Sequence, residues 1–300
     1  MLTTELYSLD LTALAQEIAG RVVTPADADW DAARAAWNLA VDQRPAAVAI
    51  PATAGDVVAI VDTARRHGLK VAPQGTGHNA AALADLSDTI IVRTSEMRGV
   101  HVDVEGRRAR VEAGALWGDL AGLASDAGLA PLAGSSHDVG IVGYTLGGGL
   151  SWLARRHGLS ADNVLAIELV TADGRHVRTD AEHEPELFWA LRGGGGNFGV
   201  VTAMELRLFE VAELYAGMLL FDWERAGEVL QAWREWTATV PTRSRRSATS
   251  CSSRPCRRSP SLCAGARSSP SRPPTSATRR RASSCCARCA RWARRWTPSR

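Results

Sequence analysis

The first 250 residues of this chain contain no cysteine, because all six cysteines lie between Cys251 and Cys289. That part of the chain therefore has no disulfide framework, which excludes the class of small secreted domains held together by disulfides. No apolar run approaches the roughly 20 residues that a membrane span needs. The first twenty residues carry acidic side chains where a secretory signal has a basic patch and an apolar run. We therefore expect a cytoplasmic protein with no membrane segment.

Basic residues are scarce in most of the chain and concentrated at its end. Lys70 is the only lysine, and 16 of the 35 basic residues are arginines from Arg243 onward, a stretch with no acidic residue. The preceding part keeps 19 basic residues against 32 acidic ones, a balance of −13. The 300 residues thus comprise an acidic body, long enough for one large domain or two ordinary ones, and a basic tail.

The tail, residues 243–300, lacks Val, Ile, Phe, Tyr and Met and has one leucine, Leu262. So little apolar surface cannot offset the entropy lost on ordering the chain. One interpretation is a disordered basic tail that binds nucleic acid or an acidic surface. The other is a shifted reading frame, since Arg, Ser, Pro, Ala and Cys are what high-GC DNA encodes out of phase. We favour the frame shift and do not expect a nucleic-acid partner.

The body shows helical and strand patterns in alternation, followed by hairpins. Alternating apolar residues predict hairpins that turn at Glu105–Gly106 and Asp173–Gly174. This order of elements predicts an α+β fold with mixed sheets. Helices are expected over 9–18, 27–39, 53–67, 116–129, 184–193 and 224–240, and further strands over 47–51, 71–73, 89–94, 197–211 and 215–223.

Four glycine-rich segments lie next to expected strand or helix ends: residues 73–79, 134–150, 156–163 and 190–202. Glycine lets backbone N–H groups come close to an anion, because no Cβ intervenes. None of the four matches the phosphate loop that ends in Gly-Lys-Ser/Thr, and none fits the strand–GxGxxG–helix fingerprint of dinucleotide-binding folds. Each alone is weak evidence for a ligand, since tight turns have the same composition.

In this order, however, the segments resemble the PCMH-type FAD-binding domain of the vanillyl-alcohol-oxidase superfamily, and most of all the berberine-bridge-enzyme-like flavin oxidoreductases of bacteria. The resemblance runs from about Arg44 to Leu208 and is carried by RPAAVAIPATAGDVVAIVDTARRHGLKVAPQGTGHN, VGIVGYTLGGGLSWLARRHGLSADNVLAIELVTADG and PELFWALRGGGGNFGVVT. It implies N-terminal helices over 1–43, the FAD-binding domain over 44–210, the start of a substrate domain over 211–242, and the basic tail over 243–300.

The resemblance implies a covalent bond between His78 and the 8α-methyl carbon of the flavin. A neutral imidazole nitrogen is a nucleophile near neutral pH, and such a bond would make the flavin a stronger oxidant. The alternative is that His78 only caps its own turn. Many relatives form a second link through a cysteine at the position of Ser136. Serine cannot form that thioether, so we expect FAD attached through His78 only.

Further cofactor contacts are implied position by position. Backbone amides of the turn at 74–79 should hold the pyrophosphate, residues 136–148 should line the flavin, ribityl and diphosphate, and two valines should add backbone contacts. The full set is Gln74, Gly75, Thr76, Gly77, His78, Asn79, Ser136, Asp138, Gly140, Val142, Gly143, Tyr144, Thr145, Gly147, Gly148 and Val201.

Other residues near these loops receive structural roles or remain open. We expect Trp117, Trp152 and Trp189 to pack in the core and Asn163 to be structural. Arg192 could pair with a phosphate or simply lie on the surface. No residue spacing indicates a metal site.

The implied activity is that of an FAD-dependent oxidase taking hydride from an alcohol, sugar or natural-product substrate, with dioxygen as the acceptor. The family's catalytic tyrosines have no counterpart after Pro241, so we assign no catalytic residue and expect a truncated substrate domain, poor solubility and weak activity. One alternative is a non-catalytic flavin-binding protein whose basic tail binds a partner. Another is a nicotinamide-linked reductase of the same flavin fold, against which LFWALRGGGGNFGVVT argues.

Overall fold

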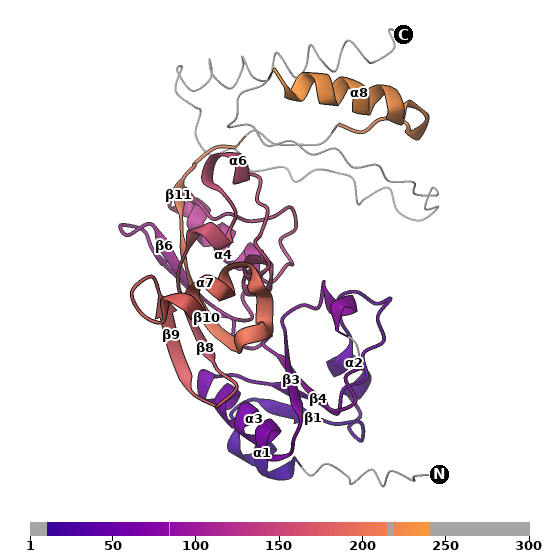
Figure 1. Cartoon of the computed structure of the whole chain (residues 1–300), viewed down its shortest axis with the longest axis vertical. Coiled ribbons are helices and arrows are strands. Elements are labelled where there is room, and N and C mark those ends of the chain that lie inside the picture. Colours follow the sequence, from indigo (N-terminus) through magenta and orange to yellow (C-terminus); the bar gives the residue numbers. More distant parts are fainter. Residues whose placement is uncertain (1–10, 84, 215–218, 240–300) are drawn as a thin grey trace. The chain divides into compact units, whose positions relative to one another are not determined.

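The computed structural model describes residues 11–83, 85–214 and 219–239 (Figure 1). Their contacts divide them into two units, residues 11–212 and 213–239, each of which is described by itself. The basic tail over 243–300 lies outside the described residues, so its frame-shift and disordered-tail interpretations both stay predictions. No described helix is both long enough and apolar enough to cross a bilayer.

The first sheet of residues 11–212 has four strands and is mixed. Its strands in spatial order are β1 (Arg21–Val23), β2 (Ala47–Ile50), β4 (Thr89–Arg93) and β3 (Lys70–Gln74). β1 runs antiparallel to β2, whereas β2, β4 and β3 are mutually parallel. Alternate residues of β2 face opposite cores: Ala47 and Ala49 pack with Leu14 and Ile60, while Val48 packs with Ala33. Both faces are therefore covered, as a parallel sheet requires.

Three helices accompany this sheet: α1 (Thr12–Glu17), α2 (Trp30–Arg34) and α3 (Ala54–Arg66). The two N-terminal helices were expected over 9–18 and 27–39, and the described helices are shorter. β1, which lies between them, was not expected from the sequence. It ties residues 11–43 to the same sheet as the parallel strands.

The second sheet has five antiparallel strands: β5 (Val100–Asp103), β6 (Arg108–Glu112), β10 (Val200–Arg207), β8 (Val164–Val170) and β9 (His176–Asp180). Both expected hairpins, β5–β6 and β8–β9, are confirmed. Gly174 has φ +85° in the second turn, a conformation that favours glycine. Together the two sheets confirm the α+β prediction.

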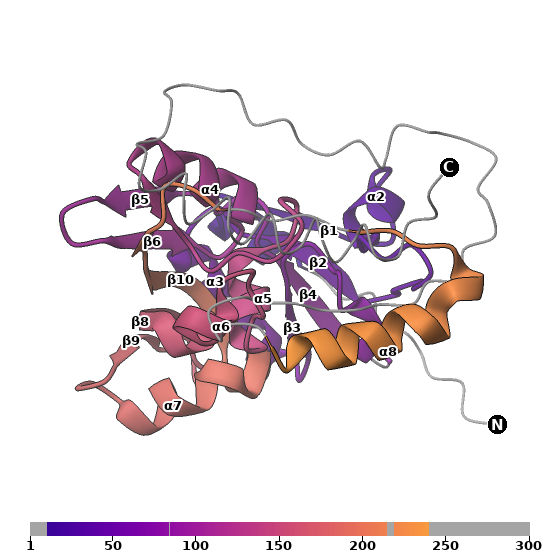
Figure 2. The same ribbon diagram turned by 90° about the horizontal axis from the view of Figure 1, so that it is seen from above.

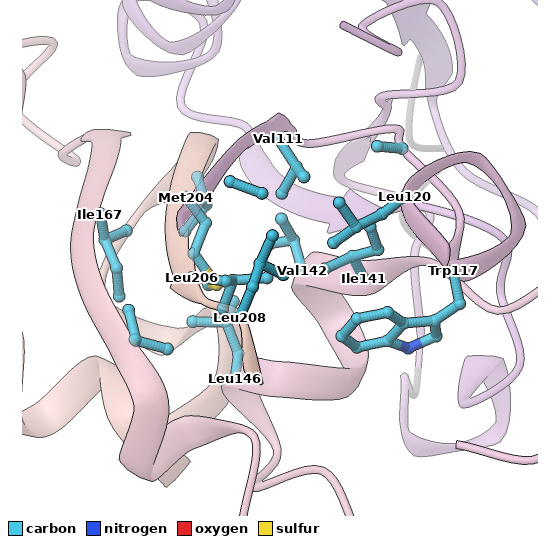
Figure 3. Packing of buried hydrophobic residues seen from close by; sticks show 14 of the residues in the cluster. Val111, Trp117, Leu120, Ile141, Val142, Leu146, Ile167, Met204, Leu206 and Leu208 are labelled. Carbon is cyan, nitrogen blue, oxygen red and sulfur yellow. The ribbon is translucent and has the colours of Figure 1, made fainter. Parts of the chain in front are cut away.

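One face of the second sheet is apolar and covered by helices. The helices are α4 (Trp117–Asp126), α5 (Ile141–Leu146) and α7 (Pro185–Gly194). Their buried side chains form one cluster with residues of β6, β8 and β10; Figure 3 shows Trp117 near Leu120 and Ile141, and Met204 among the strand residues. The two sheets lie next to each other, with β3 in contact with β10 (Figure 2).

The remaining elements are short. They are a two-stranded sheet of β7 (Leu129–Ala130) and β11 (Phe209–Glu210), helix α6 (Ala154–His157), and the 3-10 turns η1 (Ala80–Ala82), η2 (Ala161–Asn163), η3 (Gly195–Phe198) and η4 (Trp223–Arg225). The helix expected over 224–240 is confirmed as α8 (Ala226–Thr237). The strand expected over 215–223 falls partly on residues 215–218, outside the described residues, and residues 219–222 are not in a strand.

A buried carboxylate, Asp56, joins the N-terminal segment to α3. It accepts hydrogen bonds from the backbone N–H groups of Ala19, Gly20 and Ala52, at 3.2, 2.9 and 2.8 Å, and from the Thr53 hydroxyl at 2.7 Å. Burial by itself raises the pKa of Asp56, but the Thr53 hydroxyl and the three amides outweigh it, so the pKa is lowered from its ordinary value. The ionised form therefore stabilises the fold.

We expect Asp56→Ala to lower the free energy of unfolding by about 2–4 kcal/mol, because three backbone donors lose their acceptor. Because the folded-state pKa is lowered, the stabilisation is present above the unfolded pKa of about 4 and is lost as the pH falls through the folded pKa. Urea unfolding at pH 7 and at lower pH measures both effects. The control is Asp31→Ala, whose side chain is 85% exposed and whose loss should cost under about 1 kcal/mol. Equal losses for the two variants at pH 7 would contradict this role.

Candidate functional site

The turn that follows β3 leaves several backbone donors free. None of the N–H groups of residues 76–79 donates to another described residue. Gly77 has φ +85°, and a Cβ at this position would lie 2.9 Å from the Ala36 Cβ, so only glycine fits without displacement. Consecutive unpaired N–H groups in such a turn form a binding concavity for an anion.

A buried pair of amides fixes the start of this turn. Gln74, the last residue of β3, and Gln43 each donate an Nε2–H to the other's Oε1 at 3.0 Å. Both side chains are buried. The Gln74 side chain is therefore occupied by Gln43, which leaves its backbone for any contact with a ligand.

The imidazole of His78 lies under an indole. The Trp37 ring stacks on it with a centroid distance of 3.9 Å and an interplanar angle of 29°. The His78 Nε2 is shielded from solvent and has no hydrogen-bond partner among the described residues. The expectation that His78 might only cap its turn therefore finds no hydrogen bond within the described part of the chain.

Trp37 also connects this turn to the second glycine-rich segment. Its backbone N–H donates to the Thr76 carbonyl at 2.9 Å, and its Nε1–H donates to Asp138 Oδ2 at 3.1 Å. Asp138 in turn accepts from the Ser136 hydroxyl at 2.5 Å. The Ser136 hydroxyl is the main cause that lowers the pKa of Asp138, with the Trp37 N–H and the charge of His78 acting in the same direction. Asp138 is thus an anion beside the imidazole.

The backbone beyond Asp138 is open. Gly140 precedes α5, and the N–H groups of Val142 and Gly143 in its first turn donate to no described residue. A Cβ built on Gly140 or Gly143 would meet no atom within 4 Å. Space is therefore available along this stretch of main chain, next to unpaired donors.

The other two glycine-rich segments meet the first two. The Thr145 hydroxyl lies 3.0 Å from that of Ser160, and the Gly148 carbonyl accepts the N–H of Ala161 at 2.9 Å. Gly196 lies against Pro73, where a Cβ would be 3.2 Å from the proline Cγ. Segments far apart in the sequence are thus brought together at one place.

Several predicted site residues turn their side chains into the protein. Val142, Thr145 and Val201 are buried, so only their backbone remains for a ligand. The Tyr144 ring makes an edge contact with Trp117 at 5.3 Å and lies over Gly134 and Gly149. The Tyr144 ring therefore packs between its own glycine-rich segment and α4.

Of the roles expected for neighbouring residues, some are confirmed and one is wrong. Trp117 is buried, as expected, and Asn163 is structural, since its amide donates to the carbonyls of His157 and Leu159. The packing role expected for Trp189 is wrong, because its side chain is 71% exposed on α7. The guanidinium of Arg192 lies 4.4 Å from the centre of the Phe188 ring, a cation–π contact.

Sequence reasoning missed the segment of residues 35–43 and Arg93. Arg93, at the end of β4, donates to the Ala35 carbonyl at 2.8 Å, and its Nε is shielded and has no partner among the described residues. Burial lowers the pKa of Arg93 from its ordinary value. Arg93 pairs with Gln74 in the register of β3 and β4, which the sequence alone does not show. Within the described residues, no three His, Cys, Asp or Glu side chains gather where they could hold a metal ion.

Comparison with known proteins agrees with this geometry. Residues 45–180 match the family described as FAD binding domain. The chain is 38% identical over 203 residues to (R)-6-hydroxynicotine oxidase of Paenarthrobacter nicotinovorans, covering 67% of this chain and 44% of the relative. It is 33% identical over 219 residues to glucooligosaccharide oxidase of Sarocladium strictum, covering 71% and 44%. The structure of Physcomitrella patens BBE-like 1 superposes with a TM-score of 0.63 at 30% identity, covering 67% and 44%.

The fold and the glycine-lined loops thus define an FAD-binding domain. By this domain, the chain belongs to the berberine-bridge-enzyme-like flavoproteins of the vanillyl-alcohol-oxidase (PCMH) family. It spans about half the length of the curated relatives that it matches.

The residues present fit an FAD. Two stretches of unpaired main-chain N–H groups, at 76–79 and 142–143, suit its phosphate and flavin oxygens. The absence of side chains at Gly140 and Gly143 leaves room for it, and the unpaired Nε2 of His78 offers a nucleophile. Trp37 stacks on that imidazole and donates its indole N–H to Asp138.

Gly143→Ala separates cofactor binding from folding. A methyl group at this helical position meets nothing in the protein, so we expect an unchanged or higher melting temperature, since alanine is favoured over glycine in a helix by about 1 kcal/mol. If FAD lies over Gly143, the same methyl should weaken FAD binding by about tenfold, or 1.4 kcal/mol. Fluorescence titration of FAD measures the change. Gly122→Ala in α4, also without a contact, is the matched control and should leave FAD affinity unchanged. An FAD affinity equal in the two variants would remove Gly143 from the site.

Proposed function

We propose that this chain is an FAD-dependent oxidoreductase that binds FAD covalently through His78. Relatives whose names describe oxidases of a nicotine derivative and of an oligosaccharide support the reaction class. When bound, the flavin supplies the two-electron chemistry, by accepting hydride from the substrate. The residues of this chain bind the cofactor, hold it in place and attach it.

The observation that carries the proposal is the unpaired His78 Nε2 within a turn of unpaired backbone donors. A shielded imidazole nitrogen without a partner is uncommon, because buried polar atoms are normally hydrogen-bonded. Its lone pair is available to a carbon electrophile. Ser136 takes the place where a second attachment would need a thiol, and its hydroxyl is already bonded to Asp138. We therefore propose attachment at His78 alone.

The attachment can be written as a balanced exchange. His78 would exchange one N–H hydrogen for an N–C bond to the 8α carbon of the cofactor, in place of one C–H hydrogen there. The two electrons and two protons released would pass to dioxygen and give hydrogen peroxide. Dioxygen would also be the electron acceptor during turnover, and the substrate would be a small molecule with an oxidisable C–H bond beside oxygen or nitrogen.

No described side chain is assigned as the substrate base. Tyr144, the described tyrosine of the flavin loop, packs against Trp117.

The test is expression of the full chain followed by acid precipitation. We expect a yellow protein whose band near 450 nm stays with the precipitate, and whose mass exceeds that of the polypeptide by one FAD less two hydrogens. His78→Ala should bind FAD but release all of it in acid. A colourless wild-type protein that binds no added FAD would sink the cofactor assignment, whereas acid-stable flavin in His78→Ala would rule out only the attachment point.

A further inference from the structure

The contacts of His78 reveal which group controls its ring. The preceding Gly77 carries no side chain, no hydrogen bond joins the ring to Thr76 or Asn79, and its Nε2 has no partner among the described residues. The one ring contact recorded for it among the described residues is the stack with Trp37 at 3.9 Å. The orientation of the imidazole therefore depends on that indole.

A stacked contact has a particular consequence for a nucleophile. The lone pair of an imidazole nitrogen lies in the plane of the ring, whereas Trp37 covers the face. Stacking therefore restricts rotation of the ring without blocking the nitrogen. A hydrogen bond to Nε2 would also fix the ring, but it would occupy the lone pair that the new bond needs.

Trp37 itself is held from several sides. Its backbone donates to Thr76, two residues before His78, and its indole N–H donates to Asp138. The carbonyl of Ala35, two residues before Trp37, accepts from Arg93 at 2.8 Å. The indole is nevertheless 58% exposed, so burial does not account for its position. An exposed tryptophan held by two hydrogen bonds is arranged for something other than core packing.

We propose that Trp37 is a positioning residue for flavin attachment, which holds the imidazole plane of His78 by stacking while its own N–H is anchored on Asp138. The proposal rests on the proposed attachment at His78. Orienting a nucleophile in advance accelerates bond formation by removing rotational freedom before the reaction. Asp138, an anion next to the imidazole, also favours positive charge that develops on the ring while the N–C bond forms.

The experiment measures the rate of attachment separately from the affinity for FAD. The full chain is produced flavin-free in a riboflavin-starved host, mixed with saturating FAD in air, and quenched in acid at intervals. Acid-stable flavin is followed by absorbance and intact mass, and the FAD dissociation constant is measured by fluorescence within the first moments of mixing. The variants are Trp37→Ala, Trp37→Leu and Trp37→Phe. Leu39→Ala, an 85% exposed side chain of the same segment, is the control.

We expect Trp37→Ala and Trp37→Leu to slow attachment by about tenfold or more while FAD affinity changes by less than about threefold. Trp37→Phe keeps an aromatic face and should recover most of the rate, and Leu39→Ala should match wild type. Wild-type rates in Trp37→Leu, or a loss of attachment that only follows a loss of FAD binding, would overturn the positioning role.

Two further outcomes are decisive. If Trp37→Ala does not fold, the comparison of Leu with Phe decides, and equal rates in these two variants reject the proposal. If the wild-type chain binds FAD but releases all of it in acid, attachment at His78 is wrong and this proposal falls with it. If the wild-type chain attaches FAD and Trp37→Leu attaches it at the same rate, only the role of Trp37 is rejected, and attachment at His78 stands.

Discussion

The cofactor site depends on the buried amide pair of Gln43 and Gln74. Each side chain satisfies the other, and removal of either would leave a buried polar group unpaired, at a cost of about 1–3 kcal/mol. The segments 37–43 and 74–78 are thus joined at both ends. Gln43 and Gln74 pair at one end, and Trp37 stacks on His78 at the other. The hydrogen bond from the Trp37 N–H to the Thr76 carbonyl is a second connection between the turn and the segment that carries the indole.

The parts of the fold that local pattern determines could be predicted from the sequence. The hairpins follow from alternating apolar residues around Glu105–Gly106 and Asp173–Gly174. The glycine-rich segments predict accessible main chain, and two of them have N–H groups that donate to no described residue. Glycine turns can be predicted from the sequence because the conformational freedom of glycine does not depend on contacts with distant residues.

The rest of the site could not be predicted because it consists of side-chain contacts between distant residues. Trp37 and Asp138 are 101 positions apart, and Gln43 and Gln74 are 31 apart. No repeating sequence pattern links the members of either pair. A tryptophan is also expected in the core unless other evidence places it elsewhere. That default was right for Trp117, yet it is wrong for Trp189. The short strand β1 was missed for a related reason, since its three residues form a strand only by pairing with β2.

The segment of residues 35–43 lies before the region that the family description covers, which begins at residue 45. In the proposed site, main-chain donors at 76–79 and 142–143 would hold phosphate and flavin oxygens, and a main-chain donor does not depend on the identity of its side chain. Fixing the orientation of the His78 imidazole requires more than main-chain donors, because an aromatic ring must lie at stacking distance from it. The ring comes from a residue before the matched range 45–180 and is anchored on a carboxylate within that range. In the proposed attachment, binding of the dinucleotide and orientation of His78 therefore depend on different parts of the polypeptide.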